Sequence, residues 1–298
     1  MSCSDLEKNI YGFYEIKNKP SIEELSDYYR KKYYQSGEGK YNVGGGYSKE
    51  EIDFFLNKVE QKYQSVLNKN SNLSNGNKLF LDIGAGEGWA LRYFSSKGWD
   101  CLGMDFSDHG CLVNNPEQLS SLLVGDIYTN IQGLMTKGKK FDVILLDNVL
   151  EHVIDPYEML ENIRGVISDD GLLIVEVPND FSITQKQLLD EEYVSREYWV
   201  APPDHLSYFN KEGLEALAVD VGWSVETTFT AYPIDFNLFN ESTNFVENSN
   251  VGKGCHHARV AIENMLHSIS VEKTIKLYES MADLGIGREI IMILSSRH

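Results

Sequence analysis

The sequence predicts an α/β protein in which helices cover both faces of a mostly parallel sheet. A short apolar run at residues 79–83 breaks into closely spaced glycines and then into a helical pattern. Further apolar runs follow along the chain, and amphipathic stretches separate them. Continuous runs of apolar β-formers are typical of strands buried in a parallel sheet.

Three glycines follow the first of these strands at alternate positions, Gly84, Gly86 and Gly88. Glycine lets the backbone turn sharply and approach a ligand without a Cβ in the way. A helix is predicted from Trp89 to about Lys97, and its N-terminus should face whatever the loop holds. Strand, glycine loop and helix together form the general nucleotide-binding unit of doubly wound α/β proteins.

The glycine spacing argues against two nucleotide classes. A dinucleotide fingerprint counted from Gly84 needs a third glycine at position 89, where this chain has Trp89. The sequence contains no G-x-x-x-x-G-K-[ST] phosphate loop either. A nucleotide-dependent oxidoreductase is therefore disfavoured, although it stays a rival interpretation.

The loop resembles the first motif of class I S-adenosylmethionine-dependent methyltransferases, hydrophobic-Asp-hydrophobic-Gly-x-Gly-x-Gly, at residues 81–88. Three later segments stand in the order of that family. They are 100–105, which ends in Asp105, 121–126, which ends in Gly125-Asp126, and 141–156, which contains Glu151-His152. The four segments lie between residues 79 and 179, about a third of the chain.

This resemblance implies a Rossmann-like, doubly wound, seven-stranded sheet and S-adenosylmethionine as the cofactor. Asp105 should accept bonds from both ribose hydroxyls, and Asp126 matches the family position that contacts the adenine amino group. The cofactor-binding residues implied by the resemblance are Asp82, Gly84, Ala85, Gly86, Gly88, Asp105, Phe106, Asp126, Ile127, Asp147 and Asn148.

Residues 1–76 are predicted to form a helical N-terminal cap or lid. Ser21-Ile22-Glu23-Glu24 and Ser48-Lys49-Glu50-Glu51 are capping boxes, and the second opens a helix to about Leu67. Tyrosines and glycines crowd the stretch 33–47 between them. These tyrosines either pack within the cap or form a lid that contacts the methyl acceptor.

The remaining chain, residues 77–298, is predicted to be the S-adenosylmethionine-binding domain. Asp155-Pro156 starts a helix, because Asp is a good N-cap and Pro suits the first helical position. A strand at 172–177, a helix at 211–221 and a strand at 224–230 follow. A helical insertion at 237–284 then precedes the last strand, near 287–294.

Two histidines are the candidate catalytic residues. Methyl transfer needs donor and acceptor held in contact and, for a hydroxyl acceptor, removal of a proton. His152 follows Glu151 at the end of the fourth strand, and His205 lies in a His-hydrophobic-x-x-Phe segment similar to that of many small-molecule methyltransferases. An imidazole has a pKa of about 6.5 and can accept that proton; alternatively, either histidine has only a structural role.

No metal site is expected from the sequence. His256 and His257 follow Cys255, but no second ligand cluster accompanies them. The four cysteines contain no C-x-x-C pair and suit a reducing cytoplasm.

Composition limits the partners. The chain carries 27 Lys and Arg against 45 Asp and Glu, a formal net charge of −18, so nucleic acid is a poor substrate. No apolar run approaches the length of a membrane span, and the N-terminus shows no signal pattern. We therefore expect a cytoplasmic protein with neither nucleic acid nor membrane as partner.

The combined prediction is an S-adenosylmethionine-dependent methyltransferase that acts on a small molecule. Methyltransferases with a similar layout often methylate sugars, sugar nucleotides or polysaccharide precursors. This resemblance implies a carbohydrate hydroxyl as the acceptor. A catalytically silent S-adenosylmethionine-binding subunit and an N-methyltransferase of a small amine stay open as alternatives. A homodimer is left open too.

Overall fold

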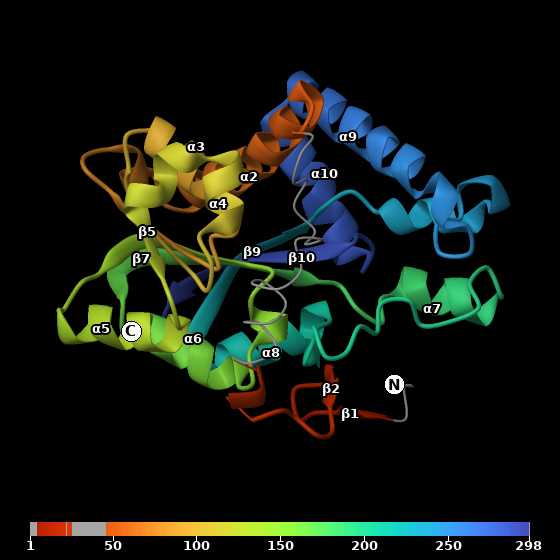
Figure 1. Cartoon of the computed structure of the whole chain (residues 1–298), viewed down its shortest axis with the longest axis horizontal. Coiled ribbons are helices and arrows are strands. Elements are labelled where there is room, and N and C mark those ends of the chain that lie inside the picture. Colours follow the sequence, from red (N-terminus) through yellow and green to blue (C-terminus); the bar gives the residue numbers. More distant parts are fainter. Residues whose placement is uncertain (1–4, 22, 26–45, 298) are drawn as a thin grey trace.

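The central feature of the computed structural model is a seven-stranded sheet (Figure 1). The structure describes residues 5–21, 23–25 and 46–297. The strand order is β5-β4-β3-β6-β7-β10-β9, in which only β10 runs antiparallel to its neighbours. The strands are β3 (Leu79–Ile83), β4 (Asp100–Asp105), β5 (Leu122–Val124), β6 (Phe141–Asp147), β7 (Ile167–Pro178), β9 (Trp223–Thr230) and β10 (Glu289–Ser296). The predicted Rossmann-like, doubly wound architecture is confirmed.

Helices cover both faces of this sheet (Figure 1). One hydrophobic cluster joins one sheet face to α5, α6 and α8, and a second joins the other face to α2, α3 and α10. The helices are α2 (Lys49–Lys69), α3 (Trp89–Ser96), α4 (His109–Asn114), α5 (Ile127–Thr136), α6 (Pro156–Arg164), α7 (Ile183–Asp190), α8 (Lys211–Val221), α9 (Gly252–Ile269) and α10 (Val271–Asp283). Side chains alternate between the clusters along a strand: Leu81 joins the first and Phe80 the second.

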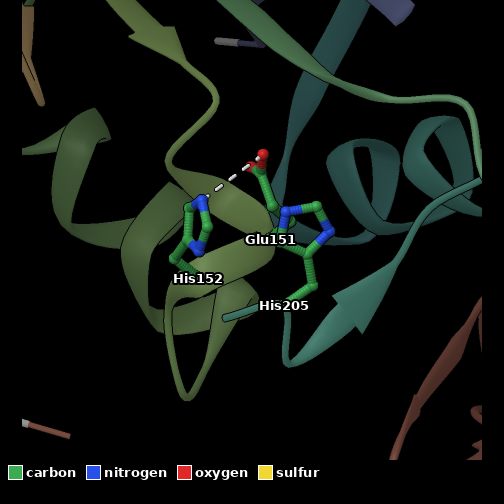
Figure 2. A group of neighbouring side chains, drawn as sticks. All are labelled: Glu151, His152 and His205. Atoms are coloured by element: carbon green, nitrogen blue, oxygen red, sulfur yellow. Dashed lines mark ion pairs between the residues drawn. The ribbon is translucent and has the colours of Figure 1, made fainter. Parts of the chain in front are cut away.

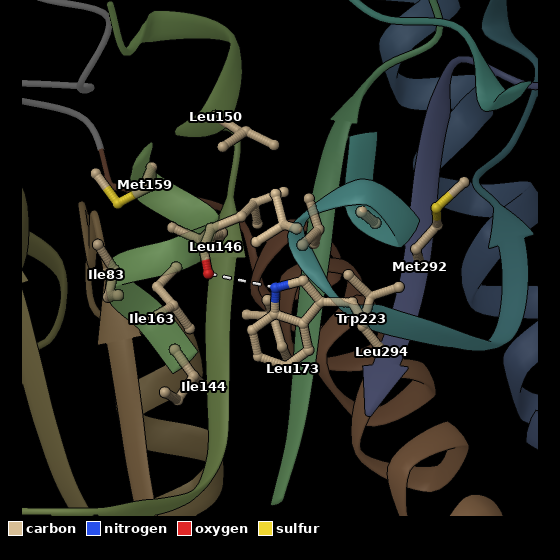
Figure 3. Close-up of a cluster of buried hydrophobic side chains, with 14 of the residues drawn as sticks. Ile83, Ile144, Leu146, Leu150, Met159, Ile163, Leu173, Trp223, Met292 and Leu294 are labelled. Atoms are coloured by element: carbon tan, nitrogen blue, oxygen red, sulfur yellow. Dashed lines mark hydrogen bonds between the residues drawn. The ribbon is translucent and has the colours of Figure 1, made fainter. Parts of the chain in front are cut away.

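The first cluster is anchored by Trp223, at the start of β9 (Figure 3). Its indole is fully buried, and Nε1 donates a hydrogen bond to the Leu160 carbonyl oxygen at 3.3 Å. The bond satisfies the one polar atom of the ring and ties α6 to the sheet. This rigid layer positions the loops that leave the carboxyl ends of the strands.

A second, three-stranded sheet corrects part of the prediction for residues 1–76. Strands β1 (Leu6–Lys8) and β2 (Tyr14–Ile16) pair with each other, and β2 pairs with β8 (Ser207–Tyr208). The expectation of helix alone is wrong for this stretch. Three-residue strands are too short to show a period, and their partner β8 is remote in sequence.

Helix α2 begins where the second capping box predicts. The Ser48 hydroxyl accepts from the Glu51 amide, and the Glu51 carboxylate accepts from the Ser48 amide. Its Val59, Tyr63 and Val66 pack in the same cluster as Phe80 and α3. This helix is therefore part of the packing around the central sheet, and the division of the chain at residue 76 stays a prediction.

The first capping box also forms, because Ser21 and Glu24 exchange hydrogen bonds of 2.8 and 3.2 Å. Residues 23–25, shortly after Ser21, are helical. The chain beyond them to residue 45, with the proposed lid tyrosines Tyr33, Tyr34 and Tyr41, lies outside the described residues.

The stretch 237–284 contains short 3₁₀ turns followed by α9 and α10, so helices precede the last strand as expected. Tyr278 of α10 packs with Phe229 of β9. Among the described residues, no helix is both long and apolar enough to cross a membrane.

Candidate active site

The glycine loop lies between β3 and α3 and is tied to the neighbouring strand. The amides of Gly84 and Ala85 both donate to the Met104 carbonyl oxygen, at 2.8 and 3.0 Å. Gly84, Gly86 and Gly88 have φ angles of 78°, 51° and 80°, the left-handed region that favours glycine. A Cβ on Gly84 would come within 2.3 Å of Val149 Cγ2, so the loop lies directly against the segment that follows β6.

Asp105 stands at the end of β4 and reaches back to this loop. Its Oδ2 accepts from the Gly86 amide at 2.8 Å, and its Oδ1 accepts from the Ser107 amide at 3.0 Å. Burial raises the pKa of this carboxyl, although the amides of Ser107, Gly86 and Phe106 oppose the rise. Each carboxylate oxygen can accept a further bond, which suits the predicted ribose contact.

Asp82, in the middle of the first motif, is only 2% exposed. Burial and the nearby Asp147 carboxylate raise its pKa to about 8, against the opposing pull of Lys62. The side chain is therefore mostly neutral at pH 7 and would gain from a cation placed beside it.

The carboxyl end of β6 carries Asp147 and Asn148. Asn148 has a positive φ of 53°, and its amide donates to the Glu176 carbonyl oxygen at 2.9 Å. Its side-chain amide donates to Asp147 Oδ1 at 2.7 Å. Because a positive φ is uncommon outside glycine, this turn is a strained point beside the loop.

Two lysines of α2 neutralise the acids behind this turn, and sequence reasoning missed them. Lys62 Nζ forms an ion pair with Asp147 and another, at 2.6 Å, with Glu176 Oε2. Lys58 Nζ lies 3.0 Å from Glu176 Oε1. Burial by itself would raise the pKa of Glu176, but the two ammonium groups lower it to about 2. The available signal was the pair of lysines four residues apart on a helix with apolar neighbours.

Asp126 and Ile127 have structural roles. Asp126 is the N-cap of α5 and accepts from the Thr129 amide at 2.8 Å, and its side chain is exposed. Ile127 is buried in the first hydrophobic cluster, and Phe106 packs against that cluster. The proposed contact of Asp126 with adenine stays a prediction.

Glu151, His152 and His205 come together beyond the turn (Figure 2). Glu151 and His152 lie in a short 3₁₀ turn, Leu150–His152, and His205 precedes β8. The His152 and His205 rings are nearly perpendicular, with centroids 4.9 Å apart. His152 Nε2 lies 3.7 Å from Glu151 Oε1.

The two halves of this cluster are joined through the backbone. The Leu206 amide donates to the Glu151 carbonyl oxygen at 2.8 Å, and the Tyr208 hydroxyl donates to the His205 carbonyl oxygen at 3.1 Å. Glu151 is 1% exposed, and burial raises the pKa of its carboxyl well above the usual range. The structure thus brings both predicted histidines together and adds Glu151, which was not among the predicted site residues.

Comparison with known proteins places this geometry in a family. A family model described as "Methyltransferase domain" matches residues 55–228, more than half of the chain. The match begins inside α2 and ends inside β9.

Several curated relatives share part of the chain. A ubiquinone biosynthesis O-methyltransferase of Glaesserella parasuis is 26% identical over 155 residues, which are 46% of this chain and 65% of that protein. A protein of the same name from a Caulobacter species is 32% identical over 133 residues, 42% of this chain and 50% of its own. The chain therefore spans less than two thirds of the length of either relative.

Among solved structures, the plantazolicin methyltransferase BpumL, in complex with a triazolic desmethylPZN analog and SAH, has a TM-score of 0.50 and 14% identity. The alignment covers 93% of this chain and 91% of that one, and it supports the fold. The family model and the fold agree with the resemblance carried by the glycine loop. The chain belongs to the methyltransferase-domain family, within the class I S-adenosylmethionine-dependent methyltransferases.

Proposed function

We propose that this protein transfers a methyl group from S-adenosylmethionine to a hydroxyl of a small-molecule acceptor. One observation carries the proposal. The glycine loop packs, at Gly84, against Val149, two residues before the buried Glu151. A donor held by the loop and an acceptor held near the histidines would therefore meet at the carboxyl edge of the sheet, where ligands bind in such folds.

The donor's adenosine would lie along the loop and the end of β4. Asp105 would accept hydrogen bonds from the ribose hydroxyls, Asp126 and Ile127 would flank the adenine, and the glycines at 84, 86 and 88 leave room for the backbone to approach the ligand. Asp82 and Asp147 supply negative charge for the cationic methionine end of the donor. The raised pKa of Asp82, about 8, is consistent with a carboxyl that ionises when such a cation arrives.

The acceptor oxygen would face His205 and His152. As the oxygen attacks, an O–C bond forms to the methyl carbon and the C–S bond breaks, and its electron pair returns to sulfur. The products are the methyl ether, S-adenosylhomocysteine and the hydroxyl proton, which His205 takes in the simplest scheme.

The relatives named ubiquinone biosynthesis O-methyltransferase support oxygen as the methylated atom. A sugar or sugar nucleotide is the acceptor suggested by the sequence resemblance, and the net charge of −18 disfavours a nucleic acid. Carbohydrate acceptors, a cytoplasmic location and a homodimer stay predictions.

The test is transfer of a labelled methyl group from S-adenosylmethionine to matched panels of phenols, sugars, sugar nucleotides and amines. On the best hydroxyl acceptor, His205→Asn should lower turnover by roughly 10²–10⁴-fold while the affinity for S-adenosylmethionine stays near that of the wild type. His256→Asn is the matched control, since that imidazole lies on α9 near Glu51, and it should change neither quantity. Methylation of the amine panel alone would overturn the hydroxyl assignment, and donor binding without transfer to any panel would favour a silent subunit.

A further inference from the structure

The cluster around Glu151 contains a buried carboxylate that its surroundings do not satisfy. Glu151 is 1% exposed, and neither of its carboxylate oxygens has a hydrogen-bond partner within the part of the chain that the structure describes. A buried charge without compensation is costly, so such groups usually pair with a cation or bind a metal. The carboxylate lies beside the two imidazoles (Figure 2).

The orientation of His152 leaves one particular nitrogen facing Glu151. Its Nδ1 lies 2.5 Å from the Asp204 carbonyl oxygen. A carbonyl oxygen only accepts hydrogen bonds, so Nδ1 carries a proton, and in the neutral imidazole Nε2 then carries the lone pair. A histidine that binds a metal is typically held this way, with its other nitrogen donating to a carbonyl or carboxylate.

The side chains are close enough to bind a single small ion after a small inward movement. One donor atom from each of Glu151, His152 and His205 lies within 4.8 Å of the others, and the His152 Nε2 to Glu151 Oε1 distance is 3.7 Å. Two ligands that bind one ion at about 2.1 Å are separated by roughly 3 to 4 Å. The backbone bond between Leu206 and Glu151 holds the two ligand segments together without the ion.

We propose that Glu151, His152 and His205 bind one divalent transition-metal ion of the zinc type, with a further coordination position left for a ligand from outside the chain. Two imidazoles and one carboxylate are the protein ligands of several catalytic zinc sites, and all-oxygen sites are the usual choice of Mg²⁺ and Ca²⁺. The prediction of no metal rested on Cys255, His256 and His257; these three new ligands come from segments remote in sequence.

The role of the ion in catalysis rests on the proposed function. Its open position would take the acceptor oxygen, and the positive charge lowers the pKa of a bound hydroxyl. With the ion bound, His205 would act as a ligand and the hydroxyl proton would leave to solvent before transfer; the role of His205 as base, described above, applies to the metal-free protein. No electron is gained or lost by the metal, and the bonds to carbon and sulfur change as described above.

Metal binding can be tested without any acceptor. We would remove metals with a chelator, titrate the whole chain with Co²⁺ and follow the visible absorption that Co²⁺ develops on nitrogen and oxygen ligands, then compete with Zn²⁺. The wild type should bind one ion per chain, and Glu151→Gln should weaken binding by at least about tenfold. Glu151→Gln removes a buried carboxylate that lacks a hydrogen-bond partner among the described residues, so the variant should fold at least as well as the wild type.

His256→Asn is the matched control, because it alters the other histidine-rich segment, and it should leave the Co²⁺ spectrum unchanged. Loss of the bands in His256→Asn with retention in Glu151→Gln would place the ion at Cys255–His257 and overturn the proposal. Absence of saturable binding in the wild type would overturn it as well. Calorimetry with S-adenosylmethionine on the same samples separates the two proposals, because donor binding without Co²⁺ binding would contradict only the metal site.

Discussion

Two buried glutamates, one within strand β7 and one just after strand β6, have opposite surroundings. Glu176, on β7, is held by Lys58 and Lys62 at 3.0 and 2.6 Å, and its pKa is lowered to about 2 although burial opposes this. Glu151 follows β6, and burial raises its pKa. Among the described residues it forms no ion pair with a lysine or arginine, and its Oε1 lies 3.7 Å from His152 Nε2.

This difference indicates a structural role for Glu176 and a functional role for Glu151. The chain neutralises Glu176 with its own lysines, and the result is a link between α2 and the sheet. It leaves the carboxylate of Glu151 beside two imidazoles, where an outside cation or an acceptor proton can complete the site. Buried charge that a protein does not balance by itself is a useful indicator of a functional position.

The largest effect should come from breaking the lysine network. Lys62→Met would leave Glu176 paired with Lys58 alone and would remove the lysine that pairs with Asp147. We expect a loss of about 3–5 kcal/mol in the free energy of unfolding. Urea denaturation measures this loss.

Lys49→Ala is the control for that experiment. Lys49 pairs with Asp53 at 3.2 Å on the exposed side of the same helix, so its removal should cost less than about 1 kcal/mol. Equal losses in the two variants would show that the buried network does not stabilise the fold.

Glu151→Gln should have the opposite effect and raise the free energy of unfolding. An acid whose pKa is raised in the folded state binds its proton more tightly there than in the unfolded chain. Its effect on wild-type stability is absent below the unfolded pKa of about 4.3 and becomes unfavourable as the pH rises towards the raised value. Without added metal, the stability of the variant relative to the wild type should therefore increase as the pH is raised above about 4 in a thermal unfolding series. A constant difference across the series would contradict the raised pKa.

Asp82 is intermediate between Glu176 and Glu151, because it has both a nearby lysine and a raised pKa. The smallest effect that we predict is on the affinity of this site for S-adenosylmethionine. Its pKa of about 8 means that it is protonated in the free protein at pH 7, whereas a bound sulfonium favours the carboxylate. Affinity for S-adenosylmethionine should rise with pH up to about 8 and then level off. Calorimetry should show a weaker trend for S-adenosylhomocysteine, which lacks the sulfonium charge, and none for Asp82→Asn. A trend of equal slope for both ligands would rule out this role for Asp82.

The sequence was informative where the signal is local. The glycine loop, the strand that follows it and the cap at Asp155 could all be predicted, because spacing and residue type determine them. Strands β1 and β2 were missed since they depend on pairing with Ser207 and Tyr208 far along the chain.

The candidate site was predicted less completely for the same reason. His152 and His205 could be chosen singly from their segments, but their contact depends on the backbone bond between Glu151 and Leu206. The lysine network joins a helix to two strands, and no motif indicates such a pairing. Burial, which decides that Glu151 differs from an ordinary surface acid, is visible only in the fold.

The central claim is that the carboxyl edge of β3 and β4 binds S-adenosylmethionine, and calorimetry on Asp105→Asn tests it most directly. Asp105→Asn keeps the size of the side chain but removes the charge that should hold the ribose, and each charge-assisted bond contributes about 1.5–3 kcal/mol. We expect saturable binding to the wild type, at least tenfold weaker binding to Asp105→Asn, and wild-type affinity in Asp108→Asn, where an exposed neighbour loses the same charge. Equal affinity in Asp105→Asn and the wild type, or no binding to the wild type, would contradict the account.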